Sequence, residues 1–257
     1  MKEEFENSGL GYHVDFKILI ASDYGVPQNR QRVIMIGFRK DLDIFPEFPN
    51  RTYSTPLTVW EAISDLPQIK AKEGEEGMNY HSKPQNEFQK FVRTSSASVY
   101  NHVAMRHTQR LIDRFKVIKA GESLAHVPVE HSAVKRGKPT EKSKIVFSQN
   151  NQRLHADLPA PTIAASFQSN FIHPYLNRNF TAREGARLQS FPDDFIFKGM
   201  RTKMSWEKGL SQYQQIGNSD PPLMAYAIAN QINKQLTVNK FQETLVSNTN
   251  LIQNKLI

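Results

Sequence analysis

The stretch Arg178–Phe195, with the sequence RNFTAREGARLQSFPDDF, contains both a helix start and a helix stop. Thr181 and Glu184 have the spacing of a capping box, in which each side chain satisfies a backbone N–H of the first turn. The residues that follow favour helix, and Pro192 ends the run because it forces the preceding residue into extended geometry. Gly185 costs this helix about 1 kcal/mol relative to alanine, so we expect another segment to pack closely against it.

Two apolar stretches near the N-terminus predict strands. Residues 11–21 (GYHVDFKILIA) are partly alternating and then fully apolar, and residues 32–38 (RVIMIGF) are rich in β-branched side chains. Continuous apolar strands are typical of a sheet that is buried on both faces. Arg30 and Arg32 should share one face at the mouth of the second strand. Two guanidiniums beside a core need anionic or carbonyl partners, although a pair of surface arginines is the alternative interpretation.

Further along the chain, helical patterns are separated by polar segments. The predicted helices cover residues 58–67, 105–119 and 223–232, and the last begins at a proline pair, which favours a helix start. The predicted loops cover residues 68–100, 130–160 and 213–222, and residues 237–257 are predicted to be a frayed polar tail. No internal repeat of solenoid period is visible.

The composition favours a polyanionic partner, since the 257 residues carry a formal net charge of +8. A merely basic soluble protein is about equally compatible with the charge alone. Cysteine is absent, which excludes disulfides, thiolate metal sites and a catalytic cysteine in this chain. Pairs such as His102 and His107 lie five apart and do not share a helix face, so no metal site is predicted. No apolar run reaches about 18 residues and the N-terminus is polar, so we expect a cytoplasmic protein.

Common nucleotide-binding and hydrolase motifs are missing from the sequence, including G-x-S-x-G, the P-loop and G-x-G-x-x-G. The tripeptide Gly217-Asn218-Ser219 precedes a predicted helix start and could hold an anion or a ligand carboxylate. It could equally be a simple loop. Physical reasoning alone therefore gives a basic α/β protein with a paired-arginine strand, and it does not fix a reaction.

Three segments, in the correct order, resemble the eighth, ninth and tenth motifs of the DNA (cytosine-5) methyltransferases. They are residues 23–32 (DYGVPQNRQR), 178–193 and 215–222 (QIGNSDPP). The resemblance implies an α/β fold that combines a partial Rossmann-like sheet of the S-adenosylmethionine-dependent methyltransferases with a smaller mixed α+β target-recognition domain. It divides the chain into catalytic-domain strands at 1–52, a target-recognition domain at 53–210, a returning motif-ten helix at 211–236 and a tail at 237–257.

The resemblance also implies a reaction and roles for residues. In this family a cysteine attacks C6 of a flipped-out cytosine, and C5 takes a methyl group from S-adenosylmethionine. Arg32 would hold the cytosine through its O2 atom, and Arg30 would support the loop or the backbone. Asn218 and Ser219 would lie beside the cofactor. The partner would be double-stranded DNA.

The same resemblance assigns DNA contacts within the target-recognition region. Thr162 and Ile163 would present base-reading groups in the major groove. The other expected DNA-binding residues, of which the basic ones would contact phosphates, are Gln28, Lys135, Arg136, Lys138 and Arg153. Arg183 and Glu184 would be scaffold residues of the ninth motif.

Several features of the family are missing. The sequence lacks the first motif (the cofactor loop), the fourth (the Pro-Cys nucleophile) and the sixth (Glu-Asn-Val), and Asp220 stands where the family has a small apolar residue. We therefore expect the smaller subunit of a split prokaryotic restriction-modification methyltransferase, inactive alone. An N-terminal half on a partner chain would supply the cysteine and complete the cofactor site. The alternatives are a stand-alone DNA-binding module and a truncated, inactive methyltransferase.

Overall fold

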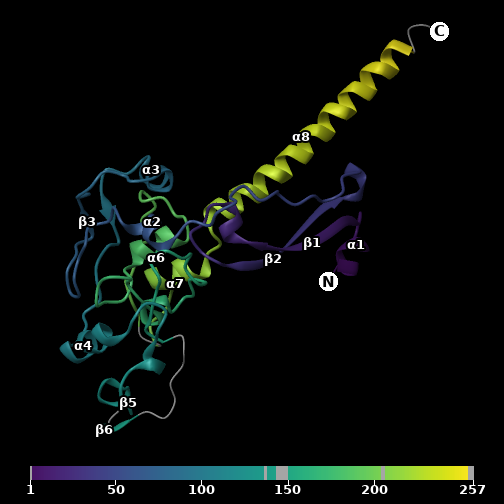
Figure 1. Cartoon of the computed structure of the whole chain (residues 1–257). Helices are drawn as coiled ribbons and strands as arrows, with labels where there is room; N and C mark the ends of the chain where they lie inside the picture. The colour runs from purple at the N-terminus through teal and green to yellow at the C-terminus, as the bar shows by residue number, and fades with distance from the viewer. Residues whose placement is uncertain (1, 136–137, 143–149, 204–205, 254–257) are drawn as a thin grey trace.

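An antiparallel hairpin and a long C-terminal helix form one side of the molecule (Figure 1). The computed structural model describes residues 2–135, 138–142, 150–203 and 206–253. The hairpin consists of β1 (Tyr12–Ile20) and β2 (Gln31–Arg39), so both predicted strands are confirmed. The helix α8 (Pro222–Gln253) begins at the proline pair as predicted. It runs beside the hairpin and projects away from the rest of the molecule (Figure 1).

The two faces of the hairpin differ in burial. On one face Ile36 and Phe38 are buried and pack against Ile232 of α8 and its apolar neighbours. On the other face Ile18 lies directly opposite Val33, and these side chains are 60% and 64% exposed. Within the described residues α8 covers one face of the hairpin, and the expected burial of both faces is not met there.

The remaining elements are short. The helices are α1 (Lys2–Glu6), α2 (Val59–Ile63), α3 (Glu87–Arg93), α4 (Gln109–Val117), α5 (Phe167–Asn170), α6 (Ala182–Leu188) and α7 (Gln212–Asn218), with 3₁₀ turns at Ala21–Tyr24, Lys40–Leu42, Leu124–His126 and Val129–His131. The strands are β3 (Gly77–Met78), β4 (Val99–Tyr100), β5 (Val134–Lys135), β6 (Lys138–Lys142), β7 (Gln152–Arg153) and β8 (Phe171–Ile172). Among the strands of the described residues, each pairs with one other, and β7 and β8 form the parallel pair. The fold is thus mixed α/β.

The largest hydrophobic core lies where α2, α6 and α7 meet, and Ile63, Leu188 and Ile216 at its centre are at most 1% exposed. α6 has the predicted capping box, in which the Thr181 hydroxyl accepts from the Glu184 N–H and the Glu184 carboxylate accepts from the Thr181 N–H. Leu223, in the first turn of α8, contacts both this core and a second apolar cluster formed by Leu19, Ala21 and Tyr24 of the hairpin region. The start of α8 therefore joins the two parts of the molecule.

Three predictions of irregular structure were wrong. Residues 68–100 hold the helix α3, whose N-cap is Asn86, and its Phe88 is 6% exposed in the main core. Residues 213–222 contain most of α7, because Ser211 and Gln214 form a capping box at its start. The predicted tail beyond residue 237 continues α8 to Gln253. In the first two cases a local cap overrode the polar composition.

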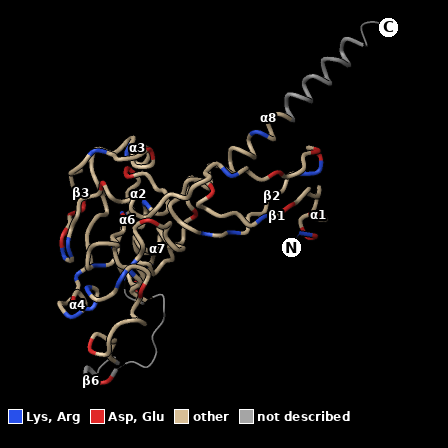
Figure 2. Tube along the Cα trace, viewed as in Figure 1, with Lys and Arg blue, Asp and Glu red and all other residues tan. Residues whose placement is uncertain are grey.

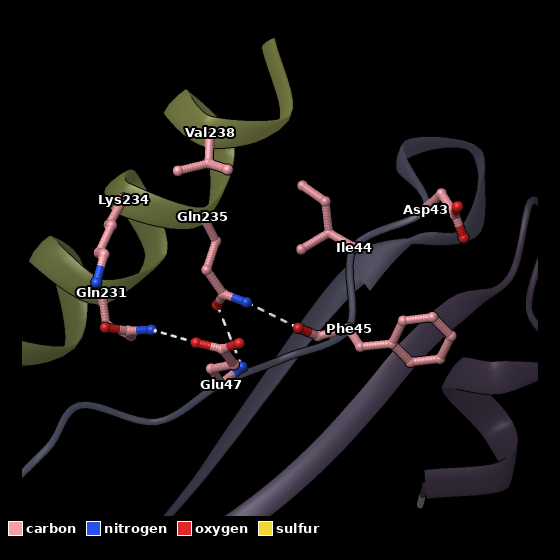
Figure 3. Close-up of a pocket in the computed structure, with 8 residues that line it drawn as sticks. All are labelled: Asp43, Ile44, Phe45, Glu47, Gln231, Lys234, Gln235 and Val238. Atoms are coloured by element: carbon pink, nitrogen blue, oxygen red, sulfur yellow. Dashed lines mark hydrogen bonds between the residues drawn. The ribbon is translucent and has the colours of Figure 1, made fainter. Parts of the chain in front are cut away.

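α8 is also held by the segment that follows β2. Gln231 donates to the Glu47 carboxylate at 3.1 Å, and Gln235 donates to the Phe45 carbonyl at 2.7 Å (Figure 3). A cleft of about 500 Å³ lies between this segment and the helix, and none of the predicted site residues lines it. No helix in the described ranges combines the length and the apolar character that crossing a membrane requires.

Gly185 is the close-packing point that the sequence predicted. A Cβ atom placed there would overlap the ring of Phe167, which is fully buried. We expect Gly185→Ala to lower the free energy of unfolding by about 1–2 kcal/mol, since overpacking outweighs the gain in helix propensity. Gly77→Ala is the control, because its nearest neighbour would be Tyr100 at 3.5 Å. Urea unfolding of both variants compares them, and equal stabilities would contradict the overpacking at Gly185.

Candidate functional site

Arg30 lies at the mouth of β2 and joins three segments. It is 3% exposed, and it donates to the carbonyl oxygens of Ile163 at 3.1 Å, Ser219 at 3.2 Å and Gly217 at 3.5 Å. Burial lowers the pKa of Arg30, the neighbouring positive charge of Arg32 lowers it further, and Asp220 opposes this. These carbonyls are partners for the two terminal nitrogens of a guanidinium beside a core, while its Nε is buried with no hydrogen-bond partner among the described residues.

Arg32 lies two residues further on, and its side chain is 38% exposed. Its Nη1 donates to the Gln31 carbonyl at 2.7 Å, and its Nε lies 4.0 Å from the Asp220 carboxylate, which is 72% exposed. An exposed pair at this distance is worth little in stability. The site thus has one buried arginine that holds backbone and one partly exposed arginine that can reach a ligand.

Gln28 is placed differently from its predicted role in DNA binding. It is fully buried, and its amide group donates to the Leu188 carbonyl at 3.0 Å and to the Gln189 side chain at 2.9 Å. Its side-chain oxygen accepts from the Ile163 N–H at 2.8 Å. A side chain whose polar atoms are all engaged inside the protein does not contact DNA, so Gln28 is a structural residue here.

The predicted cofactor residues end α7. Gly217 has no room for a side chain, because a Cβ atom would overlap the backbone of Ala164 and Ala165. Asn218 is exposed, and Ser219 caps the helix with its hydroxyl donating to the Ile216 carbonyl at 2.7 Å. The link between α7 and α8, Asn218 and Ser219, therefore exposes Asn218 to solvent, while the backbone at Gly217 is packed against Ala164 and Ala165.

The predicted base-reading pair divides into an exposed and a buried residue. Thr162 is exposed, and its hydroxyl donates to the Asn29 carbonyl at 3.4 Å. The Ile163 side chain is fully buried in the main core. Ile163 therefore cannot present its side chain to a base edge, and the prediction fails for this residue because its side chain packs into the main core.

Arg153 was predicted to contact phosphates, but its guanidinium is committed inside the protein. It is 7% exposed, and it donates to the carbonyls of Ile118 and Phe115 and to the Asn177 side chain, among others. Burial lowers its pKa. Arg136 and the side chains of Lys135 and Lys138 lie outside the described residues, so these three remain sequence predictions.

A buried ionic cluster surrounds α6. Arg178 binds the Glu184 carboxylate with both terminal nitrogens, at 2.8 and 2.7 Å. Arg187 binds Asp193 at 2.6 Å and Asp65 at 2.8 Å, and all three side chains are fully buried. Arg183 donates to backbone carbonyls of neighbouring loops. These side chains tie α6 to the loops around it, and none of them is free to act on a ligand.

Gln189 is the site residue that the sequence did not single out. It is fully buried and connects the Gln28 side chain with the Ile216 carbonyl at 2.8 Å and the Ser219 carbonyl at 3.4 Å. Its position after the last turn of α6 gave no local signal, because its partners lie 27 to 161 residues away in sequence.

These residues define a class of protein. It is a basic mixed α/β chain in which the partly exposed Arg32 and the polar Asn218–Ser219 segment lie beside a buried network of polar side chains. The family model of the C-5 cytosine-specific DNA methylases matches residues 1–234. The chain therefore belongs to the C-5 cytosine-specific DNA methylase family.

Individual relatives are longer than this chain. It is 54% identical over 256 residues to the type II methyltransferase M.DdeI of Desulfomicrobium norvegicum, covering 98% of this chain and 61% of the relative. It is 33% identical to M1.HphI of Haemophilus parahaemolyticus, covering 91% and 51%. A solved structure described as a DNA modification methyltransferase encoded within an E. coli prophage matches with a TM-score of 0.65 at 23% identity, covering 88% of this chain and 61% of that one. That match shows the fold alone.

Proposed function

We propose that this chain is the C-terminal, DNA-recognising part of a DNA cytosine-5 methyltransferase of the restriction-modification type. It acts on double-stranded DNA and uses S-adenosylmethionine, in the cytoplasm of a prokaryotic cell. The family membership and the two type II relatives support this proposal. The net charge of +8 is suited to a polyanionic substrate.

The observation that carries the proposal is the geometry of Arg32. Its guanidinium is the exposed member of the arginine pair, and Arg30 behind it is fixed by three backbone carbonyls. A guanidinium donor at a strand mouth, next to a neighbour that is fixed, can hold the O2 atom of a cytosine that has been turned out of the duplex. We assign this role to Arg32 and a supporting role to Arg30.

The cofactor side lies at the link between α7 and α8. Asn218 is exposed, whereas the Ser219 hydroxyl already donates to a carbonyl. Asn218 therefore fits a polar contact to S-adenosylmethionine through its amide, and Ser219 fits one as an acceptor. The cofactor supplies the methyl group that C5 of cytosine receives.

The rest of the enzyme would cover the exposed hairpin face. Phe16, Ile18 and Val33 on this face are each more than half exposed, and an apolar patch of this kind marks an interaction surface. We propose that the N-terminal part of the methyltransferase packs there, on a partner chain, and supplies the Pro-Cys motif and most of the cofactor pocket. The reading frame immediately upstream tests this, because the partner should carry that motif.

Within the chain, residues 1–52 and 211–236 would belong to the catalytic domain and residues 53–210 to target recognition. The contact of α8 with the hairpin supports the first assignment. Thr162 and the basic residues of 135–138 remain the proposed DNA contacts, and Figure 2 shows further Lys and Arg along α4. The exposed hairpin face argues against the alternative of a stand-alone DNA-binding module.

Replacing Arg32 by alanine is the experiment that tests the function. In the assembled enzyme we expect methylation to fall at least about 100-fold, as it does when one preorganised donor is lost, with little loss of DNA affinity. Transfer of a labelled methyl group to DNA measures activity, and filter binding measures affinity. Lys234→Ala, on the exposed side of α8 that lines the cleft away from this site, should leave methylation unchanged. Near wild-type activity of Arg32→Ala would contradict the assignment.

A further inference from the structure

A buried polar network joins the base side of the proposed site to its cofactor side. Gln189 lies at its centre, fully buried between Gln28 and the last turn of α7. Its side-chain oxygen accepts from Gln28, and its side-chain nitrogen donates to the carbonyls of Ile216 and Ser219. Both ends of one amide are therefore used, and each end reaches a different part of the site.

The network is closed through Arg30. The Ser219 carbonyl accepts from Gln189 at 3.4 Å and from Arg30 at 3.2 Å. Arg30 and Gln28 also hold the backbone of Ile163 on both sides. Arg30 donates to the Ile163 carbonyl, and Gln28 accepts from the Ile163 N–H. The segment before β2, the residues around Ile163 and the link after α7 are thus fixed to one another by side chains that are at most 3% exposed.

Close backbone packing also fixes the distance between α7 and the segment that contains Ala164 and Ala165. Gly217 brings α7 into direct contact with the backbone of Ala164 and Ala165, and any side chain there would separate the two segments. Because α7 is held so closely, a shift at Gln189 cannot be absorbed by a local change of the link. It would move Asn218 and Ser219 relative to Arg32.

We propose that Gln189 is a positioning residue of the methyltransferase site, which sets the placement of the Asn218–Ser219 link against the arginine pair. This inference rests on the proposed function. Gln189 touches neither base nor cofactor, and it acts through Gln28 and through the Ser219 carbonyl. Its loss should therefore change the use of the cofactor and the rate of transfer, while phosphate contacts made elsewhere keep DNA affinity.

Gln189→Met tests the proposal in the enzyme assembled from this chain and the rest of the methyltransferase. Methionine keeps the buried volume but leaves one N–H of the Gln28 amide without an acceptor and removes one donor from each of the Ile216 and Ser219 carbonyls. We expect the KM for S-adenosylmethionine to rise about tenfold and kcat to fall about tenfold, as for a buried hydrogen-bonding group left unsatisfied. The KM for DNA should stay within about twofold of wild type.

Gln89→Met is the matched control. Gln89 is also fully buried with three side-chain hydrogen bonds, to Glu61, Ser64 and Gln85. It belongs to α3 and contacts the α2 region, and it takes no part in the network. Both variants should lose similar thermal stability, and only Gln189→Met should change the kinetic constants. Equal kinetics of the two variants in an active enzyme overturn the positioning role. A wild-type assembly that does not methylate DNA overturns the proposed function and this inference with it.

Gln189→Glu gives an independent readout through its pH profile. A protonated carboxylic acid can accept from Gln28 and donate to the Ser219 carbonyl, whereas the ionised form would face the Ile216 and Ser219 carbonyls without a proton to share. Activity relative to wild type at the same pH should therefore recover as the pH is lowered. A ratio that stays constant with pH counts against the role of this contact.

Discussion

Arg187→Met is expected to destabilise the protein by about 3–5 kcal/mol, a large part of the total stability of a domain. The guanidinium donates to the Asp193 carboxylate at 2.7 and 2.6 Å, to Asp65 at 2.8 Å and to the Ala62 carbonyl at 2.9 Å. Burial alone lowers the pKa of Arg187, but attraction to Asp193 and Asp65 outweighs it and raises the pKa. Methionine would leave two buried carboxylates without this partner.

The measurement is urea unfolding followed by circular dichroism, with two further variants for comparison. Arg187→Lys keeps the charge but cannot bind two carboxylates with a planar fork, so an intermediate loss is expected. Lys116→Met removes an exposed ion pair with Asp113, and its effect should stay below about 1 kcal/mol. A loss at Arg187→Met no larger than that at Lys116→Met would show that the cluster does not support the fold.

The cluster also shows what the sequence could and could not predict. The capping box of α6 was predictable because Thr181 and Glu184 lie three residues apart, and a local pattern decides it. The pairing of Arg187 with Asp65 joins residues 122 apart, and no local pattern indicates it. Asp193 follows the predicted helix in sequence, and only the structure shows that it is fully buried against Arg187.

The same distinction separates the site residues. The sequence placed the two arginines at the start of the second strand, and the structure has Arg30 just before β2 and Arg32 within it; that they share one face stays a prediction. Gln28, Ile163 and Arg153 were assigned to DNA on chemical type and resemblance, and each is buried by partners that are distant in sequence. Whether a polar side chain faces solvent or fills a core depends on tertiary packing, which short-range patterns do not contain.

A marked loss of stability in mild acid is the second expected result, and it follows from three buried histidines. Burial lowers the pKa of His102 to about 4, of His107 to about 4 and of His173 to about 3. Their surroundings are filled by fixed polar groups: His102 contacts the Thr181 hydroxyl and the Pro67 carbonyl. The folded protein therefore keeps these rings neutral.

The sign follows from proton linkage. An unfolded histidine binds a proton near pH 6.5, whereas the folded rings remain neutral until about pH 4. Between these values the unfolded state binds more protons, so stability falls as the pH falls. Each ring contributes up to about 1.4 kcal/mol per pH unit, and three together up to about 4. Above about pH 7 the three histidines do not make the free energy of unfolding depend on pH.

Glu184 extends the loss to lower pH. Burial alone would raise the pKa of its carboxyl group, but the attraction and hydrogen bonds of Arg178 outweigh burial and hold the pKa well below its usual value of 4.5. The stability from this ion pair is present above that value and is lost as the pH falls below it. The histidines therefore act first on acidification, and the ion pair fails afterwards.

Urea unfolding at pH 7.5, 6.5, 5.5 and 5.0 measures the slope, and two variants assign it. His102→Gln removes one titrating ring while keeping hydrogen-bonding groups at the site, so the slope below pH 6 should fall by about a third. His81 is exposed, and His81→Gln should leave the slope unchanged. Stability that stays flat from pH 7.5 to 5.0 would mean that the buried rings take up protons in the folded state. The packing around Glu184 would then have to open to water without unfolding, which its 1% exposure and bidentate contact with Arg178 oppose.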